Sequence, residues 1–375
     1  MKFQVVRENL SKALGIANKA ISVKASLPIL QNVLLQNDEG RLKIVSTDLD
    51  KSIITWIGAK IEGEGSLTIP ARALHAFVSG LSDEQIFGEI KDSHLILKTN
   101  KSQATFNGMS SSEYPTLDYS ISKDHFVINS DILKRAVDET YFSANVDDSS
   151  NPEWTGILLR VVDNALHFVG LDGFRLSKKH VFLNQLEKSS KKFKEVIIPS
   201  KNFLEIVRLS PSKSPIKIDI QLSKSTVVFD LGDLFFISKV LDGEFPDYEK
   251  VIPAEHIARF DVDYAEFLSA VKLSLVFAKD NNAIRINVNV SEGNLEILSD
   301  DAELGNNRLT VGIKNSEGEN VEMAFNAKYL LDYLNNVPSD ELTVKISGQT
   351  NPVAIIPKGR DDYIHVAVPL QVYWE

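Results

Sequence analysis

The stretch RLKIVSTD at residues 41–48 decides the fold, because it returns twice further along the chain. Residues 165–172 read ALHFVGLD and residues 294–301 read NLEILSDD. In each copy apolar residues alternate along a short run, which is typical of a half-buried strand, and an acidic residue follows six positions after the first leucine. The repeat predicts three equivalent strands that end in similar turns.

Two helix patterns repeat in the same order as this strand. The first has apolar residues at i, i+3 and i+4, typical of an amphipathic helix, and follows a short strand that contains a phenylalanine. Its copies carry Phe3 with Leu10, Ala13 and Leu14; Phe126 with Leu133, Ala136 and Val137; and Phe260 with Phe267, Ala270 and Val271. The second helix begins after a turn-forming residue and a cation. Its copies carry Pro70 and Arg72, Pro199 and Lys201, and Asn326 and Lys328.

The spacing of these patterns predicts the domain organisation. Corresponding positions lie 123 to 134 residues apart, and one third of the 375 residues is 125. Three patterns in one order at one period indicate an internal repeat. We therefore predict an α+β fold of three similar domains in tandem, residues 1–124, 125–253 and 254–375, each with two helices packed on antiparallel sheets.

The composition excludes several classes of protein. The chain is 43% hydrophobic and 25% charged, which is typical of a folded protein, and it contains no cysteine. A disulfide scaffold, a thiolate metal site and a cysteine nucleophile are therefore excluded. The start, MKFQVVRE, lacks the apolar core of a signal peptide, and no run approaches the roughly 18 apolar residues of a membrane span. We expect a cytoplasmic protein with no membrane partner.

Motifs of known enzymes are absent from the sequence. We find no Gly-x-Ser-x-Gly elbow, phosphate-binding loop or His-Glu-x-x-His motif, and the seven histidines lack metal-ligand spacing. The acids that recur in all three repeats, Asp48, Asp172 and Asp301, are better explained as turn-forming residues than as a catalytic set. We therefore predict no catalytic residue, metal or cofactor, although an enzyme with an unfamiliar site remains a third alternative.

The charge is distributed unevenly. The net charge of the chain is −10, which argues against nucleic-acid binding through a generally basic surface. The six predicted helices, in contrast, carry a small positive excess. If they share one surface, that surface could lie along a phosphate backbone without reading bases.

Several short motifs fall at fixed places along the chain: KASLPIL (24–30), TDLD (47–50), IPAR (69–72), LDGFRL (171–176), LDGEFPDY (241–248) and VAVPL (366–370). Together they resemble the bacterial DNA polymerase III β subunit, the sliding clamp, over the whole chain. The resemblance implies a head-to-tail homodimer that forms a closed ring of six similar domains around duplex DNA. Such a ring contacts DNA without sequence preference and tethers the polymerase, so it confers processivity without catalysis.

The resemblance also implies three sets of site residues. Lys24 and Arg72 would contact DNA, and Lys12, Lys19, Lys134, Lys201 and Arg208 are added because of their helix positions. Ala104 and Phe106 on an edge strand would meet Leu275 and Val276 of a second copy. A pocket for partner peptides would be lined by Trp154, Leu171, Gly173, Phe174, Arg175, Leu176, Pro246, Val251, Asn326, Tyr329, Val366, Val368, Pro369 and Leu370. Without the resemblance, the apolar members of this pocket read as ordinary core.

The partners implied are the DNA polymerase III α subunit, the clamp loader and other proteins with a clamp-binding motif, such as repair polymerases, mismatch repair proteins and ligase. The sequence departs from the family pattern at four places, one of which is residues 151–153 (NPE), where some relatives carry aromatic or basic residues that point at DNA. Trp154 replaces a smaller aliphatic residue, Phe174 replaces a common histidine, and Tyr373, Trp374 and Glu375 extend past the usual end. Because of these departures, the sequence does not predict which peptide the pocket prefers. The alternative function is a repeat-built interaction scaffold that does not encircle DNA.

Overall fold

The computed structural model describes residues 1–22, 27–148, 150–186, 195–278 and 282–371. Within these residues the chain forms six α-helices, as the repeated patterns predict. They are α1 (Arg7–Ala17), α2 (Ala71–Gly80), α3 (Ser130–Asp138), α4 (Ser200–Leu209), α5 (Tyr264–Leu275) and α6 (Ala327–Asn336). All sheet pairings are antiparallel in this part of the chain, which confirms the predicted α+β class.

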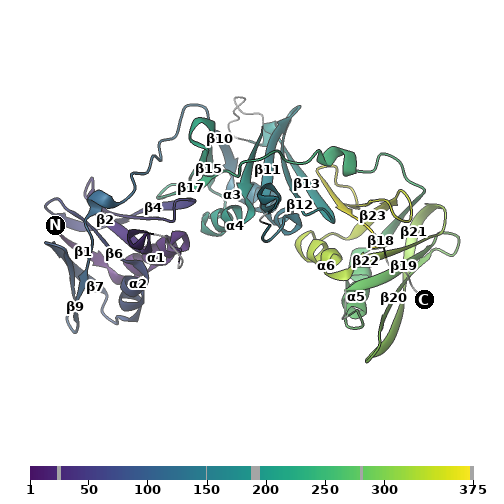
Figure 1. Cartoon of the computed structure of the whole chain (residues 1–375), viewed down its shortest axis with the longest axis horizontal. Coiled ribbons are helices and arrows are strands. Elements are labelled where there is room, and N and C mark those ends of the chain that lie inside the picture. The colour runs from purple at the N-terminus through teal and green to yellow at the C-terminus, as the bar shows by residue number, and fades with distance from the viewer. Residues whose placement is uncertain (23–26, 149, 187–194, 279–281, 372–375) are drawn as a thin grey trace. The chain divides into compact units, whose positions relative to one another are not determined.

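Contacts divide the chain into two compact units, coloured by residue number in Figure 1. Unit 1 comprises Met1–Asp131, Leu186–Phe193 and Glu205–Val240, and unit 2 comprises Ile132–Gln185, Lys194–Leu204 and Leu241–Glu375. Both units contain parts of the central repeat. The boundaries after residues 124 and 253 therefore stay predictions.

Unit 1 contains a five-stranded sheet, in the order β5-β1-β7-β8-β9, and an eight-stranded sheet, in the order β10-β15-β16-β17-β4-β3-β2-β6. The strands are β1 (Lys2–Val6), β2 (Asn32–Asp38), β3 (Arg41–Thr47), β4 (Lys51–Gly58), β5 (Lys60–Glu62), β6 (Ser66–Pro70), β7 (Gln85–Lys91), β8 (His94–Lys98), β9 (Gln103–Asn107), β10 (Phe126–Asn129), β15 (Pro215–Gln221), β16 (Thr226–Asp230) and β17 (Leu234–Lys239). Helices α1 and α2 lie side by side, and Leu10, Leu14, Leu74 and Val78 bury their apolar faces against the strands.

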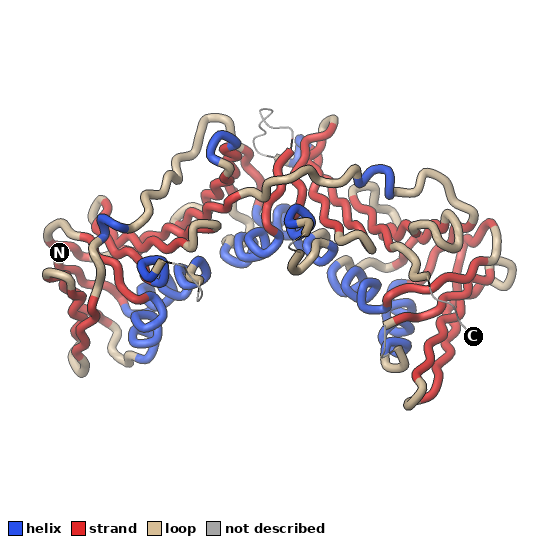
Figure 2. Tube along the Cα trace, in the orientation of Figure 1, coloured by secondary structure: helices blue, strands red, loops and turns tan. Residues whose placement is uncertain are grey.

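Unit 2 contains one twelve-stranded sheet, in the order β14-β11-β12-β13-β25-β24-β23-β18-β21-β20-β19-β22. The strands are β11 (Gly156–Val162), β12 (Ala165–Leu171), β13 (Arg175–Phe182), β14 (Glu195–Pro199), β18 (Ala258–Asp263), β19 (Ala283–Asn289), β20 (Asn294–Asp301), β21 (Gly305–Gly318), β22 (Val321–Asn326), β23 (Glu341–Ile346), β24 (Val353–Pro357) and β25 (Tyr363–Ala367). Figure 2 shows α5 and α6 packed together against strands of this unit.

The strand order repeats three times. Strands β1-β7-β8-β9 correspond to β10-β15-β16-β17 and to β18-β23-β24-β25. Strands β6-β2-β3-β4 correspond to β14-β11-β12-β13 and to β22-β19-β20-β21. Successive repeats are joined by strand pairing. Strand β17 of the second repeat pairs with β4 of the first, and β25 of the third repeat pairs with β13 of the second.

The recurring acids form turns, as predicted. The Oδ1 atom of Asp48 accepts hydrogen bonds from the backbone N–H groups two and three residues later. Asp172 and Asp301 accept the same pair of bonds in their own repeats. A carboxylate that satisfies two turn N–H groups explains why an acid recurs at this position.

Candidate functional site

The turn between β12 and β13 begins the predicted pocket. Gly173 has a φ of +83°, in the left-handed region that L side chains rarely adopt. The ring of Trp154 lies against it, so that a Cβ added at Gly173 would stand 3.0 Å from Cζ3 of Trp154. Glycine is therefore required here by both backbone conformation and close approach.

Arg175 joins this turn to α6. Its Nε donates to Oδ2 of Asp172 at 2.9 Å, and its Nη1 donates to Oδ2 of Asp332 at 2.6 Å. Its Cζ lies 4.3 Å from the ring centroid of Tyr329, which is a cation–π contact. The Arg175 side chain is only 8% exposed. Burial raises the pKa of Asp172, although Arg175 and two backbone N–H groups oppose that shift.

An exposed aromatic side chain lies beside this buried arginine. Phe174 is 53% exposed, and its ring centroid lies 6.1 Å from that of Tyr329. The backbone of the C-terminal segment is fixed next to it, because Val368 donates its N–H to the carbonyl of Phe174 at 2.8 Å. Leu370 donates in the same way to Ala324 at 2.7 Å. Phe174, Tyr329 and the segment from Val368 are thus brought together.

The remaining predicted pocket residues divide by burial. Leu171, Leu176 and Val366 are buried in one apolar cluster with Phe245 and Tyr248, and Trp154 packs at its margin. Pro369 is buried, Pro246 and Leu370 are half-buried, and Val251 is 38% exposed. The side chain of Asn326 caps α6 by accepting the N–H of Lys328 at 3.0 Å. Sequence reasoning missed Asp332, which has no motif of its own.

The predicted DNA-contacting residues are exposed wherever the structure describes them. These are Lys12 on α1, Lys19 in the 3₁₀ turn after it, Arg72 on α2, Lys134 on α3, and Lys201 and Arg208 on α4. Lys19 lies 3.5 Å from Glu205, whereas the other five make no ion pair within the described ranges. Lys24 lies outside the described residues.

Among the strand edges that are unpaired in the parts of the chain that the structure describes, two belong to the strand types that join successive repeats. Strand β9, which carries Ala104 and Phe106, pairs only with β8 and is an edge strand, as predicted. The first half of β21, from Gly305, pairs only with β20, because β18 pairs with the second half. Leu275 at the end of α5 is half-buried and Val276 beside it is 54% exposed. The repeat pattern could have identified the β21 edge, but the sequence analysis missed it.

A buried ionic cluster holds the junction between β13 and β25. Arg360 donates two hydrogen bonds to the carboxylate of Glu139, at 2.8 and 2.7 Å, and Lys179 bonds to Asp362. Although burial opposes it, hydrogen bonds from Arg360 and Lys179 lower the pKa of Asp362 to about 2. Since breaking a buried ion pair costs several kcal/mol, the pair of Arg360 and Glu139 stabilises this part of unit 2 as long as both partners are present.

His365 lies in the same junction and makes unfolding pH-dependent. Its ring is fully buried, stacks on Tyr333 with centroids 4.5 Å apart, and bonds Ser177 through Nδ1. Burial lowers its pKa from 6.5 to about 3. Below pH 6.5 the ring of His365 is therefore protonated in the unfolded chain but stays neutral in the folded chain. The free energy of unfolding falls as the pH falls through this range.

We expect His365 to reduce the free energy of unfolding by about 2 kcal/mol between pH 7 and pH 5. Carboxylates with lowered pKa values, such as Asp362, act mainly below this window. Urea unfolding of the wild type and of His365→Asn at pH 7, 6 and 5 measures the effect as a difference in pH slope. Equal slopes in the two proteins would contradict it.

No helix in the described ranges is long and apolar enough to cross a membrane. No group of three or more His, Cys, Asp or Glu side chains in the same ranges is arranged to hold a metal ion.

Comparison with known proteins gives consistent matches along the chain. Models of the DNA polymerase III β subunit match in succession: the N-terminal domain over residues 1–118, the central domain over 127–247 and the C-terminal domain over 249–371. The β sliding clamp of Synechococcus elongatus is 28% identical, covering 99% of this chain and 100% of the relative, and that of Staphylococcus aureus is 26% identical with 100% of both covered.

Solved structures agree with these sequence matches. The crystal structure of the DNA polymerase sliding clamp from Bacillus subtilis superposes with a TM-score of 0.93 at 25% identity and covers 100% of both chains. That of the DNA polymerase III β subunit from Pseudomonas aeruginosa gives 0.91 at 26% identity, covering 99% of this chain and 100% of that one.

Proposed function

The chain belongs to the family of DNA polymerase III β subunits, and from this premise we propose that it acts in the cytoplasm as a sliding clamp. Two copies form a closed ring around duplex DNA and tether the replicative polymerase to it. A tethered polymerase has a high effective concentration at the primer end, so it rebinds faster than it diffuses away. The chain is a processivity factor and not a catalyst. The observation that carries this conclusion is the succession of three family domains from residue 1 to residue 371.

We propose that the ring closes by the same strand junction that the chain uses twice internally. Strand β17 pairs with β4, and β25 pairs with β13, which is the equivalent of β4 in the second repeat. The equivalent strands that lack such a partner are β9 in the first repeat and β21 in the third. In a head-to-tail dimer, β9 of one copy would pair with the first half of β21 of the other. Two such contacts close the ring, and an edge strand that gains a partner also loses its tendency to aggregate.

The internal junctions also support one register for this proposed contact. At the first internal junction Ser238 faces Lys51, and at the second Ala367 faces Arg175. The carbonyls of Lys51 and Arg175 each accept the backbone N–H of the recurring acid of their own repeat. The equivalent of Ser238 and Ala367 in the first repeat is Phe106, and Gly305 is the residue opposite Asp301. Phe106 would therefore face Gly305 of the second copy. Ala104, Leu275 and Val276 complete the proposed contact.

For the DNA contact we propose Lys12, Lys19, Lys24, Arg72, Lys134, Lys201 and Arg208. Cations on flexible side chains attract phosphates without reading bases, which suits a ring that must slide. The net charge of −10 opposes binding elsewhere on the surface. DNA is therefore held weakly by charge and retained mainly by topology.

For partner proteins we propose a peptide site around Phe174 and Arg175, with the other predicted pocket residues as its walls. An exposed aromatic side chain beside a fixed guanidinium supports this proposal, because such anchors dominate the energy of peptide recognition. Its partners would be the DNA polymerase III α subunit, the clamp loader, and repair polymerases, mismatch repair proteins and ligase that carry a clamp-binding motif.

Retention on circular DNA tests the function. We expect the protein, loaded onto nicked circular DNA by its own clamp loader with ATP, to stay on the circle in gel filtration and to leave once the circle is cut. Retention on both forms would indicate ordinary binding and contradict encirclement. Retention on neither, with loader activity verified, would favour the interaction scaffold.

A further inference from the structure

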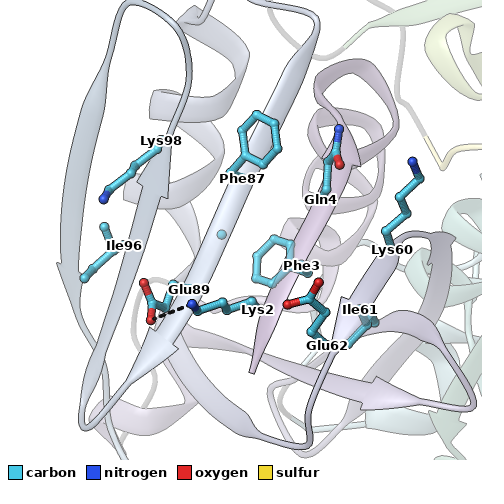
Figure 3. Close-up of a pocket in the computed structure, with 11 residues that line it drawn as sticks. Lys2, Phe3, Gln4, Lys60, Ile61, Glu62, Phe87, Glu89, Ile96 and Lys98 are labelled. Atoms are coloured by element: carbon cyan, nitrogen blue, oxygen red, sulfur yellow. Dashed lines mark ion pairs between the residues drawn. The ribbon is translucent and has the colours of Figure 1, made fainter.

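A hollow of about 520 Å³ lies on the five-stranded sheet of unit 1, and it contains none of the site residues discussed above. Strands β1, β5, β7 and β8 form it (Figure 3). A volume of this size falls in the range of sites that hold small ligands or a few side chains.

One row of side chains crosses all four strands. The register places Lys60 opposite Gln4, Gln4 opposite Phe87, and Phe87 opposite Lys98. Phe87 is 48% exposed, and Figure 3 shows the two lysines on opposite sides of it. Since neighbouring strands lie about 4.8 Å apart, the Cα atoms of Lys60 and Lys98 are about 14 Å apart.

The charges of the two lysines in this row are not compensated. In the next row Lys2 stands between Glu62 and Glu89, and its Nζ lies 3.9 Å from Oε1 of Glu89. Lys60 and Lys98, in contrast, are exposed and make no ion pair with any described residue. An otherwise acidic chain thus presents two free cations on either side of an exposed aromatic ring.

We propose that this hollow binds an extended acidic peptide in which two carboxylates flank an apolar side chain. Alternate residues of an extended chain share one face, and residues i and i+4 lie about 13 Å apart. The pattern acid-x-apolar-x-acid therefore matches the two lysines and places the apolar side chain over Gln4 and Phe87. Nucleic acid fits less well, because two cations neutralise few of the closely spaced phosphates of a nucleic-acid backbone.

Methyl NMR on the full-length protein tests this site, since Ile61 and Ile96 are among the residues that line the hollow. The probe is a synthetic peptide that contains Glu-Ser-Leu-Ser-Glu, and its control carries Gln in place of both Glu residues. We expect the acidic peptide to shift both methyl signals and the control to leave them in place. Raising the salt concentration should weaken the binding.

A matched pair of variants identifies the lysines involved. The double variant Lys60→Gln/Lys98→Gln should weaken the acidic peptide at least tenfold, whereas Lys91→Gln/Lys101→Gln, which removes the same charge from exposed positions outside the hollow, should not. Equal binding of the acidic and control peptides, no shift at millimolar peptide, or shifts caused by oligothymidylate instead would each overturn the proposal. None of these outcomes bears on the retention of the ring by circular DNA.

Discussion

Replacing Phe106 with Glu is expected to convert the dimer into monomers, with at least a 100-fold rise in the dimer dissociation constant. Phe106 is half-buried on β9, and its ring lies 5.6 Å from that of Phe77. A carboxylate at this position would be desolvated at each of the two ring contacts, which costs several kcal/mol per ion. A cost of about 2.7 kcal/mol already corresponds to 100-fold. Sedimentation from nanomolar to micromolar concentration measures the change.

Two further variants separate the contact from the fold. Phe87→Glu makes the same substitution on the same sheet at a largely exposed position and should leave the dimer intact. Val276→Lys alters the opposite side of the contact at a 54% exposed residue, where a cation suits the end of α5. It should dissociate the dimer while the circular dichroism spectrum of the protein stays that of the folded wild type. A dimer that persists at nanomolar concentration in both Phe106→Glu and Val276→Lys would contradict the proposed contact.

The proposed register has its own measurement, because the chain contains no cysteine. If Phe106 faces Gly305, then Thr105 faces Asn306 of the second copy. Cysteines at Thr105 and Asn306 should therefore form a disulfide that closes the ring covalently. Cysteines at Thr105 and Arg308, two positions out of register, should not, because a disulfide needs Cα atoms within about 7 Å. Efficient cross-linking of the second pair alone would disprove the register.

The sequence predicts those parts of the fold that depend on neighbouring residues. The recurring acids were identified because each turn needs an acceptor for two nearby N–H groups, and the structure confirms this role for Asp48, Asp172 and Asp301. The helices were found because an apolar stripe must face the core. Local patterns that serve a steric or hydrogen-bonding need can be read without the fold.

Features that depend on distant residues could not be read in this way. Arg175 bonds Asp332 across 157 positions, and no local pattern marks that pair. Leu171, Leu176 and Val366 are all buried in one cluster, although alternation alone predicts the same pattern for a core and for the wall of a site. The pairing of β17 with β4 and of β25 with β13 likewise appears only once the sheets are assembled.

The same burial changes how the proposed peptide site should be tested. Removing Arg175 would leave the buried carboxylate of Asp172 without its ion-pair partner, and breaking such a buried pair typically costs about 3–5 kcal/mol of stability. Deleting the chain from Val366 would remove part of β25, because Val366 is fully buried in that strand. Either change could weaken peptide binding through loss of structure alone.

Phe174→Ala and removal of residues 369–375 avoid this difficulty. Phe174 is 53% exposed, and the truncation keeps β25 and the bond from Val368 to the carbonyl of Phe174. If Phe174 and the C-terminal segment anchor partner peptides, each change should weaken binding at least tenfold while the dimer stays intact, since a truncated anchor commonly costs 2 kcal/mol or more. Fluorescence anisotropy with a labelled peptide from the clamp-binding segment of the polymerase α subunit measures this. Because neither change removes a residue of β25 or of the strand edges proposed to close the ring, unchanged affinity in both would remove the site from this surface and leave ring closure unaffected.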